Sequence, residues 1–393
     1  MTSSAAVIGV VGGGQLARML VQAASKREIP VVVQTPSVDD PASDGATRVV
    51  SADPRDVAGT RRLVEGCRGI TFENEWVNID ALIPLEQQGI RFRPALAALA
   101  PLVDKISQRQ LLEDLNLPCP PWTPLSRISP SQPALPKGWT FPVMAKASRG
   151  GYDGKGTLVL SSVDELAQLI RCENPSEWLL EAWVHYDREL ALVVSRDIKG
   201  RVRSFPLVET HQSRQVCDWV LAPALVEQSV DALAYNMAAS LLTKLNYVGV
   251  MALEFFHGPD GLQVNEIAPR THNSGHFSID ACSSSQFDQQ LCIVAGLPVP
   301  TPQLTCDGAL MVNLLGLPPG GQVAPLDERL NRLRERPDSY LHWYGKTPET
   351  PGRKMGHITV LLRGADAASR REEALRARDD IRRVWPVCLD CND

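Results

Sequence analysis

The spacing of apolar positions predicts that the chain begins with a small parallel β-sheet. Ala5–Val11 is a short apolar strand that runs into a glycine-rich turn and a helical pattern, as at the start of a βαβ unit. Pro30–Gln34 and Arg68–Phe72 have the pattern of further strands, and Asp56–Glu65 has that of a helix between them. We therefore expect residues 1–104 to form a Rossmann-like, doubly wound domain.

A second region is organised around a lysine and a glycine loop. A helix is predicted to begin at Asp104 and to end near Leu117 and Pro118, and the proline-rich stretch 118–136 follows it as a linker. The next apolar strand ends in Lys146 and leads into residues 150–156, where glycines are interleaved with cations. Backbone amides and cations in such a loop suit polyphosphate, although a flexible hairpin turn is an alternative. We expect a central domain over residues 105–184.

The segment 248–276 combines a predicted hairpin with two acids. Two apolar runs flank a turn at residues 258–261, which is typical of a β-hairpin. Glu254 and Glu266 fall within about one position of being cross-strand neighbours, where side chains lie roughly 5 Å apart. Two carboxylates so close repel each other unless a cation lies between them, and a hard ion such as Mg²⁺ prefers oxygen ligands. Acids on a hairpin often belong to a solvated face, but the apolar neighbours of both glutamates favour a Mg²⁺-nucleotide site.

The rest of the pattern predicts a larger C-terminal domain over residues 185–393. Tyr340–Lys346 and Pro351–Leu362 are expected to build a small terminal sheet. The other predicted strands are Leu179–Val184, Arg188–Ser195 and Ala309–Leu315, and the predicted helices are Ala232–Leu245, Ser285–Ala295 and the charged Ala367–Val384.

The composition of the chain argues against two classes of binding partner. The 393 residues carry a net charge of −5 without a block of basic residues, so neither nucleic acid nor an anionic membrane is indicated. No apolar run reaches the roughly 18 residues of a membrane span. The scattered cysteines suggest free thiols in a reducing compartment, and we expect a cytoplasmic protein.

The first glycine turn does not have the pattern of a dinucleotide site. Ala17 stands where the third glycine of that pattern would be, and Gln34 stands where an acid would bind ribose. NAD binding is therefore not favoured. Glu73 and Glu75 follow the third strand at its carboxyl end, where ligands of such sheets usually bind, although a surface turn is equally compatible with them.

Other kinds of site find little support in the sequence. No Ser-His-Asp order, HExxH motif or Cys-His nucleophile pattern is present, and the seven histidines are too dispersed for a histidine-based metal site. Lys346, Arg353 and Lys354 cluster around glycines, which suits either an anion site or ordinary surface charge.

Taken together, these motifs resemble the ATP-grasp superfamily and, within it, the 5-(carboxyamino)imidazole ribonucleotide synthetases, the ATP-dependent carboxylases of purine biosynthesis. The resemblance covers nearly the whole chain. The strings that carry it occur in the family's order, and they are Gly12–Leu16 with Arg18 and Met19, Gly150–Gly156, Asn265–His276, Leu341–Lys346 and Pro351–His357. It implies an α/β and α+β ATP-grasp architecture with an N-terminal Rossmann-like domain, a small central lid domain and a C-terminal domain.

The resemblance also implies where ATP and Mg²⁺ bind. Lys105 and Lys146 would meet the phosphates, and the glycine loop would close over them. Glu254 and Glu266 would hold Mg²⁺, with two ions expected. The implied ATP contacts are Lys105, Lys146, Gly151, Tyr152, Asp153, Gly154, Lys155, Gly156, Glu181, Ala182, Trp183 and Val184 at the adenine, Glu189 at the ribose, His211, Asn265 and Glu266.

The other substrates would be bicarbonate and aminoimidazole ribonucleotide. Arg270, His272 and Lys354 are the implied catalytic residues, with Arg270 and His272 facing bicarbonate. The implied contacts of the ribonucleotide are Gly14, Gln15, Glu73, Tyr152, Asp153, Arg270, Lys346 and Arg353. The expected reaction is carboxylation of the ribonucleotide through a carboxyphosphate intermediate, and the family resemblance favours a homodimer.

Two departures from the family pattern bear on these contacts. Thr350 stands where similar sequences often carry arginine, which puts one phosphate contact in doubt, and the histidine at His211 is shifted by about one position. The main alternative is another ATP-grasp carboxylate-amine ligase, such as a formate-dependent transformylase. A nicotinamide dehydrogenase would rest on the first glycine turn alone, and a non-catalytic nucleotide sensor would require damaged phosphate or Mg²⁺ positions.

Overall fold

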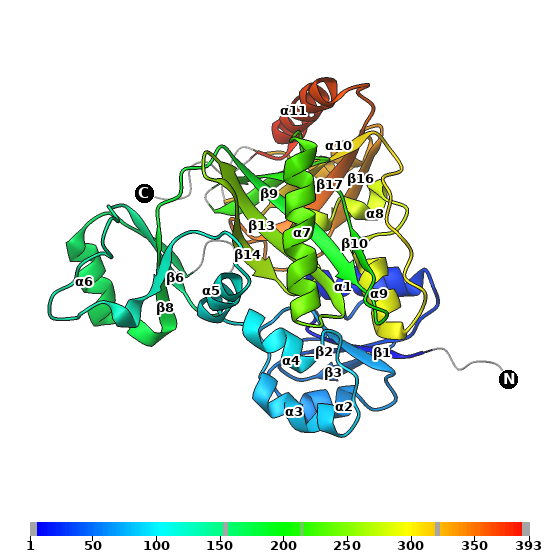
Figure 1. Ribbon diagram of the computed structural model, residues 1–393. Helices are drawn as coiled ribbons and strands as arrows, with labels where there is room; N and C mark the ends of the chain where they lie inside the picture. Colours follow the sequence, from blue (N-terminus) through cyan, green and yellow to red (C-terminus); the bar gives the residue numbers. More distant parts are fainter. Residues whose placement is uncertain (1–5, 152–155, 214, 319–322, 387–393) are drawn as a thin grey trace.

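The computed structural model describes residues 6–151, 156–213, 215–318 and 323–386. Within these residues the strands form three sheets of four, four and nine strands. Figure 1 shows the four-stranded sheets beside and below the large sheet, which occupies the middle of the molecule. The expected mixed α/β and α+β class is confirmed. The predicted domain boundaries at residues 104 and 184 stay a prediction.

The N-terminal sheet is parallel, as the βαβ pattern predicts. Its strands run in the order β3-β2-β1-β4, and every residue of β1, β2 and β4 is buried, as is usual for a parallel sheet covered on both faces. The sequence analysis missed β3, which is short and largely solvent-accessible. The elements are β1 (Ile8–Val11), α1 (Gln15–Ser25), β2 (Val31–Thr35), β3 (Arg48–Ser51), α2 (Val57–Leu63), β4 (Gly69–Phe72), α3 (Ile79–Gln87) and α4 (Leu96–Leu99).

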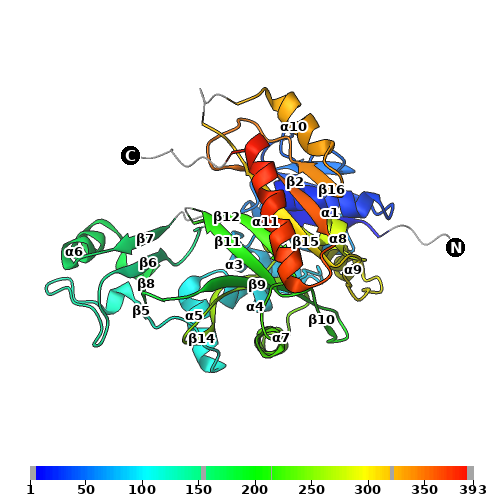
Figure 2. The same cartoon turned by 90° about the horizontal axis from the view of Figure 1, so that it is seen from above.

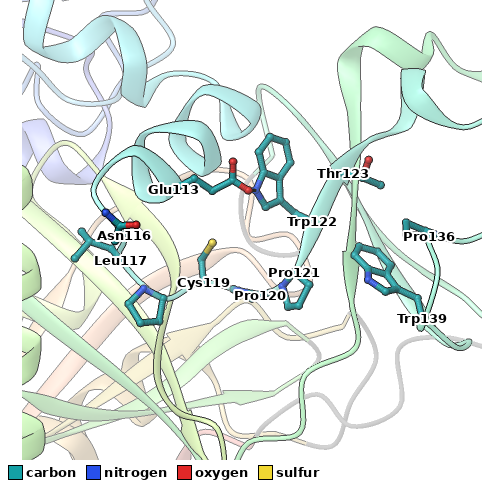
Figure 3. Close-up of a pocket in the computed structure, with 11 residues that line it drawn as sticks. Glu113, Asn116, Leu117, Cys119, Pro120, Pro121, Trp122, Thr123, Pro136 and Trp139 are labelled. Carbon is teal, nitrogen blue, oxygen red and sulfur yellow. Dashed lines mark hydrogen bonds between the residues drawn. The ribbon is translucent and has the colours of Figure 1, made fainter.

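The central region is a small antiparallel sheet with one helix packed on it. The strand order is β5-β8-β6-β7, and Leu166, Leu169 and Ile170 of α6 pack on this sheet. The elements are α5 (Lys105–Asp114), β5 (Trp122–Pro124), β6 (Val143–Ala147), β7 (Thr157–Leu160), α6 (Val163–Cys172) and β8 (Trp178–Ala182). The linker between α5 and β5 borders an open hollow of about 640 Å³, which Figure 3 shows with its proline and tryptophan lining.

The large sheet contains the predicted hairpin at one edge. Its order is β14-β13-β9-β11-β12-β15-β17-β16, with β10 paired to β9. The small separate sheet predicted at residues 340–362 is therefore wrong, because β17 pairs with β15 along its length and is buried in the larger sheet. The strands are β9 (Arg188–Arg196), β10 (Val202–Ser204), β11 (Val208–Ser213), β12 (Val216–Ala222), β13 (Gly249–Gly258), β14 (Gly261–Ala268), β15 (Gly308–Leu315), β16 (Ser339–Trp343) and β17 (Lys354–Leu362).

Helices cover both faces of the large sheet. The register places Leu190, Glu209 and Leu221 on one face, which α7 (Gln228–Lys244) and α11 (Ala367–Val384) cover with α10 (Leu326–Arg334). Figure 2 shows α7 and α11 lying over different strands of that sheet. The short helix α8 (Ser278–Ala281) and the buried helix α9 (Gln286–Ala295) lie on the other side, where α9 contacts both α1 and β13.

Helix α9 ties the N-terminal sheet to the large sheet. The Gln290 amide group donates to Thr71 Oγ1 at 2.8 Å, and its oxygen accepts from the Val250 N–H at 2.7 Å. These contacts are buried, so they hold the carboxyl end of β4 close to the hairpin of β13 and β14. In the described part of the chain, no helix has the length and apolar character that crossing a membrane would require.

Candidate active site

Glu254 on β13 and Glu266 on β14 lie directly opposite each other. From the turn onwards the ladder pairs Phe255 with Val264, and it then shifts by one residue so that Glu254 pairs with Glu266. Asn265 is the extra residue of this β-bulge. The predicted cross-strand proximity of the two glutamates is therefore confirmed, and the bulge removes the one-position offset.

The two carboxylates have opposite electrostatic environments. Burial, and then the charge of Glu266, raise the pKa of Glu254 to about 7. Burial also opposes ionisation of Glu266, but Lys105 Nζ lies 2.5 Å from Glu266 Oε1 and holds the pKa of that carboxyl below its ordinary value. A cation placed between the two carboxylates would favour the ionised form of both. Paired oxygen ligands with excess negative charge fit a hard divalent ion such as Mg²⁺.

Lys146 approaches the same strand from the central sheet. It lies on β6, and its Nζ is 2.6 Å from Glu181 Oε2 and 3.1 Å from Asn265 Oδ1. Burial lowers the pKa of Lys146, while the charge of Glu181 opposes that shift. Lys105 and Lys146 therefore both reach β14 beside the paired glutamates, as expected for two lysines that meet one polyphosphate.

Glu181 is fully engaged with cations, which the sequence did not indicate. Besides Lys146, it meets Arg109, whose Nε and Nη2 lie 2.7 and 2.5 Å from Glu181 Oε1. Burial alone would raise the pKa of Glu181, but Arg109 and then Lys146 bring it below its ordinary value. An adenine contact in this segment would thus fall to the main chain of residues 182–184 rather than to the carboxylate. Arg109 was missed, although its position four residues after Lys105 on a helix was a usable signal.

Glu189 and His211 come together on neighbouring strands. Glu189 on β9 pairs with Thr210 on β11, and its carboxylate accepts from the Tyr186 hydroxyl at 2.7 Å. Burial raises the pKa of Glu189. The His211 ring stacks on Trp219, with centroids 5.2 Å apart. The grouping is compatible with the expected nucleotide contacts, and Tyr186 was missed.

The glycine loop is described at its ends. Gly156 accepts from the Ala147 N–H through its carbonyl at 2.7 Å, and its φ is +73°, a conformation that favours glycine. Tyr152, Asp153, Gly154 and Lys155, all of them predicted ligand contacts, lie outside the described residues. Gly151, the residue before them, lies four residues beyond the end of β6 at Ala147.

Arg270 and His272 follow β14 and make different side-chain contacts. Arg270 Nε donates to Glu75 Oε2 at 2.8 Å, and although burial opposes its charge, Glu75 raises the pKa of Arg270. His272 Nε2 lies 3.4 Å from Glu254 Oε1, and its Nδ1 accepts from the Ser274 N–H at 3.3 Å. Burial, reinforced by Arg270, lowers the pKa of His272 well below its ordinary value. The Ser274 N–H at Nδ1 favours the tautomer that carries its proton on Nε2, toward Glu254.

The predicted ribonucleotide contacts gather partly at the start of α1. Glu73 accepts from the Gly14 N–H at 2.6 Å and from the Leu16 N–H at 3.2 Å, so it acts as an acceptor for the free amides of the helix. Burial raises the pKa of Glu73. Lys346 donates to the Gln15 side chain and, at 2.8 Å, to the Lys354 carbonyl. Glu73, Gln15 and Lys346 therefore share one corner of the junction.

Arg353 and Lys354 start the last long strand. Arg353 donates to the carbonyl oxygens of Thr347 and Pro348 at 3.1 and 2.9 Å, so its guanidinium is bound to its own loop. The electrostatic influence of Lys354 reaches Glu254 and His272, which places it near the carboxylates, as expected for a catalytic cation. Whether Arg353 contacts a substrate phosphate stays a prediction.

Two of the histidines, which the sequence suggests are too dispersed for a histidine-based metal site, lie close together beside Asp280. His342 and His357 face each other on paired strands, and a ligand atom of each lies within 4.8 Å of the other and of an Asp280 oxygen. The two rings are stacked with an angle of 14° between their planes, so their in-plane lone pairs point to separate positions rather than to one ion. His342 Nε2 instead hydrogen-bonds Asp280 Oδ2 at 2.9 Å, and His357 Nδ1 hydrogen-bonds Tyr344 at 2.7 Å.

Comparisons with known proteins agree with this geometry. Three family models match the chain: a ribonucleotide synthetase preATP-grasp domain over residues 5–102, an ATP-grasp domain over 110–287 and a phosphoribosylaminoimidazole carboxylase C-terminal domain over 309–371. The chain is 45% identical to N5-carboxyaminoimidazole ribonucleotide synthase of Synechococcus elongatus, covering 96% of this chain and 95% of that protein. The synthase of Bacillus subtilis is 33% identical, with 92% and 93% covered.

Solved structures of such enzymes have the same fold. Carboxyaminoimidazole ribonucleotide synthase from Aspergillus clavatus complexed with ATP gives a TM-score of 0.85 at 29% identity, covering 96% of this chain and 99% of that one. The same organism's enzyme in complex with ADP and 5-aminoimidazole ribonucleotide gives 0.84 at 28% identity, with 97% and 98% covered. Because the sequence identity extends over nearly the whole chain and the architecture is shared, the chain belongs to the N5-carboxyaminoimidazole ribonucleotide synthase family of ATP-grasp enzymes.

Proposed function

We propose that this chain is an ADP-forming ligase that uses ATP and bicarbonate to carboxylate 5-aminoimidazole ribonucleotide to 5-(carboxyamino)imidazole ribonucleotide in purine biosynthesis. The observation that carries the proposal is the meeting of four groups at the junction of the three sheets. Two lysines, two paired glutamates, an arginine–histidine pair and a ribonucleotide corner all lie around the hairpin of β13 and β14. Full-length identity to synthases of this family supports it.

ATP would lie between the central sheet and the large sheet. Lys105 and Lys146 would bind its phosphates, because both ammonium groups reach β14 from the central region. The main chain of residues 182–184 would border adenine, and Glu189 would accept from the ribose hydroxyls. Cations in a water-poor site stabilise the charge that moves to the leaving ADP.

Glu254 and Glu266 would hold Mg²⁺, with Asn265 beside them. The raised pKa of Glu254 supports this assignment, because its two largest causes are burial and the charge of Glu266, and a bound cation would offset both. When bound there, Mg²⁺ would neutralise phosphate oxygens during transfer. The expectation of two ions is part of the same proposal.

Arg270 and His272 would orient bicarbonate for attack on the γ-phosphorus. The bicarbonate oxygen forms the new P–O bond as the bond to ADP breaks, which gives carboxyphosphate. Glu75 fixes the Arg270 fork, and Ser274 fixes the His272 tautomer so that its Nε2–H faces the reacting region. Lys354 adds positive charge next to these groups. The amine of the ribonucleotide then forms the C–N bond, and phosphate leaves with the electron pair of the broken C–O bond.

The ribonucleotide would bind in the corner formed by the start of α1 and the last strands. Gln15 and Lys346 would meet its phosphate, with Gly14, Glu73 and Arg353 lining the same corner. Tyr152 and Asp153 are assigned to this substrate from the family resemblance. A homodimer and a cytoplasmic location are further parts of the proposal, and they rest on the resemblance and the free cysteines.

The test measures ADP release with ATP, Mg²⁺, bicarbonate and aminoimidazole ribonucleotide, omitting each in turn. We expect turnover to require all four components and the carboxylated product to appear in proportion to ADP. Turnover that ignores the ribonucleotide, or that continues at the same rate after bicarbonate is removed, contradicts the proposal.

A further inference from the structure

The outer edge of β14 is covered by α5 and the segment after it. β14 is the terminal strand of the large sheet, so its outward N–H and C=O groups have no strand partner. Gln108 replaces such a partner at Ile267, with which it makes hydrogen bonds of 3.3 and 3.1 Å. The Pro118 carbonyl accepts from the Val264 N–H at 2.8 Å. Between these two points lies Asn265, the residue of the bulge.

Arg109 binds the carbonyl of that bulge residue. Its Nη2 donates to the main-chain oxygen of Asn265 at 2.6 Å, from the residue that follows Gln108 on α5. The bulge is what brings Glu254 opposite Glu266, so a donor that fixes its carbonyl also fixes the register of the two glutamates. Without this donor, a polar group at the strand edge would be left unsatisfied.

The same guanidinium binds the central sheet. Arg109 is 2% exposed and contacts Glu181 Oε1, while the other oxygen of Glu181 contacts Lys146 at 2.6 Å. Lys146 then reaches Asn265 Oδ1 at 3.1 Å, so the contacts return to the residue at which they began. This closed ring of contacts joins the central sheet to the large sheet directly beneath the proposed phosphate site.

We propose that Arg109 is a positioning residue that sets the distance between Lys146 and the Glu254–Glu266 pair, acting through Glu181 and the Asn265 carbonyl. The inference rests on the proposed function, because it assigns the phosphate to Lys146 and the metal to the glutamates. A buried ion group of this kind is a costly way to gain stability alone, since hydrophobic replacements are often equally stable. Its geometry instead defines where one charged ammonium lies relative to two carboxylates.

Without Arg109, Glu181 loses the partner that holds its Oε1. Both of its oxygens are then free to turn onto Lys146, which draws that ammonium away from the phosphate. A displacement of about 1 Å in a catalytic group costs on the order of 100-fold in rate. Loss of the donor to Asn265 adds a second disturbance, at the register of the glutamates.

The chain offers a matched control on the exposed side of the same helix. Figure 3 shows Glu113 of α5 against the Trp122 indole of β5, and this hydrogen bond is 2.8 Å long. It joins the same helix to the same sheet, but it makes no contact with Lys146 or β14 in the described structure. Trp122→Phe therefore tests whether the joint between helix and sheet matters by itself.

The experiment compares Arg109→Met, Arg109→Lys and Trp122→Phe in the full-length protein. We expect Arg109→Met to lower kcat about 100-fold and to raise the Mg²⁺ concentration for half-maximal rate several-fold. Arg109→Lys keeps a cation for Glu181 but lacks the fork for Asn265, so we expect about a tenfold loss of kcat and a near-normal KM for ATP. Trp122→Phe should stay within about twofold of the wild type in all these quantities.

A double-mutant cycle with Glu181→Gln separates positioning through Glu181 from a general structural contribution of Arg109. If Arg109 acts through Glu181, adding Arg109→Met to Glu181→Gln lowers kcat by far less than the single substitution does. Additive losses overturn the proposal, as does a kcat for Arg109→Met within about twofold of the wild type. Equal losses in Arg109→Met and Trp122→Phe overturn it as well.

Two measurements keep the test decisive. Wild-type turnover in the omission assay decides the proposed function by itself, while calorimetric titration with ADP in Mg²⁺ follows the lysine and glutamate positions without any ribonucleotide. We expect weaker ADP binding in Arg109→Met, and unchanged binding contradicts the inference even if the reaction proves to be a different one. If Arg109→Met does not fold, Arg109→Lys decides, and wild-type kinetics in that variant overturn the proposal.

Discussion

Glu254→Gln should make the metal-free protein more stable at pH 8 while it abolishes turnover. Burial and Glu266 raise the pKa of Glu254 from 4.5 to about 7, so its ionisation costs the folded state about 3 kcal/mol at about 1.4 kcal/mol per pKa unit. The folded pKa of Glu254 lies above its unfolded value. The stability that the protonated carboxyl contributes is therefore fully present below about pH 4.5 and is lost as the pH rises through about 7. Glutamine keeps the oxygen that faces His272 and removes the charge.

The assay is differential scanning calorimetry in EDTA at pH 5 and pH 8, repeated with Mg²⁺ and ADP. We expect the variant to melt above the wild type at pH 8, with a much smaller difference at pH 5. Mg²⁺ and ADP should stabilise the wild type at pH 8 and have little effect on the variant, because one metal ligand is gone. An advantage that is equal at both pH values, or absent at pH 8, would refute the link between the raised pKa and the paired carboxylates.

Three further predictions concern other residues of the site. Lys346→Met should raise the KM for the ribonucleotide at least about tenfold by removing a charged phosphate contact, with ADP binding by calorimetry unchanged, and a normal KM would remove Lys346 from that site. Glu73→Ala should lower the free energy of unfolding by about 1–3 kcal/mol, because it removes the acceptor for the Gly14 and Leu16 amides, and denaturant titration that finds no change would contradict this. His272→Asn should lower kcat without moving the acidic limb of the pH–rate profile, because burial keeps His272 neutral there, and a shifted limb would show that this histidine titrates in the working range.

The local chemistry of the site is readable from the sequence because its residues lie in short continuous segments. The hairpin with Glu254 and Glu266 and the strand that carries Lys146 follow from strand and turn signals, whereas the roles of Arg270 and His272 follow from the family resemblance. The parallel N-terminal sheet was likewise predictable, since buried strands alternate there with helices. The predicted bounds of the last helix, Ala367–Val384, agree with those of α11.

Other contacts depend on segments far apart in the chain. Arg109 meets Glu181 and Asn265, and Lys346 meets Gln15, across separations that no local pattern encodes. The register of β16 with β17 decides that His342 and His357 face each other, and the packing of α8 brings Asp280 to the same place. Strand order decides such neighbours, and it is set by how the apolar faces pack together.

By itself, the sequence predicted the charged residues proposed for the site and the local element on which each lies, because turns, periodicity and glycine loops act over a few residues. The tertiary structure alone decided their final partners. A one-residue bulge aligns the two glutamates, and a buried arginine joins that bulge to the lysine of another sheet. The physical reason is that a buried charge needs a compensating partner, and the packing of separate sheets determines which partner lies within reach.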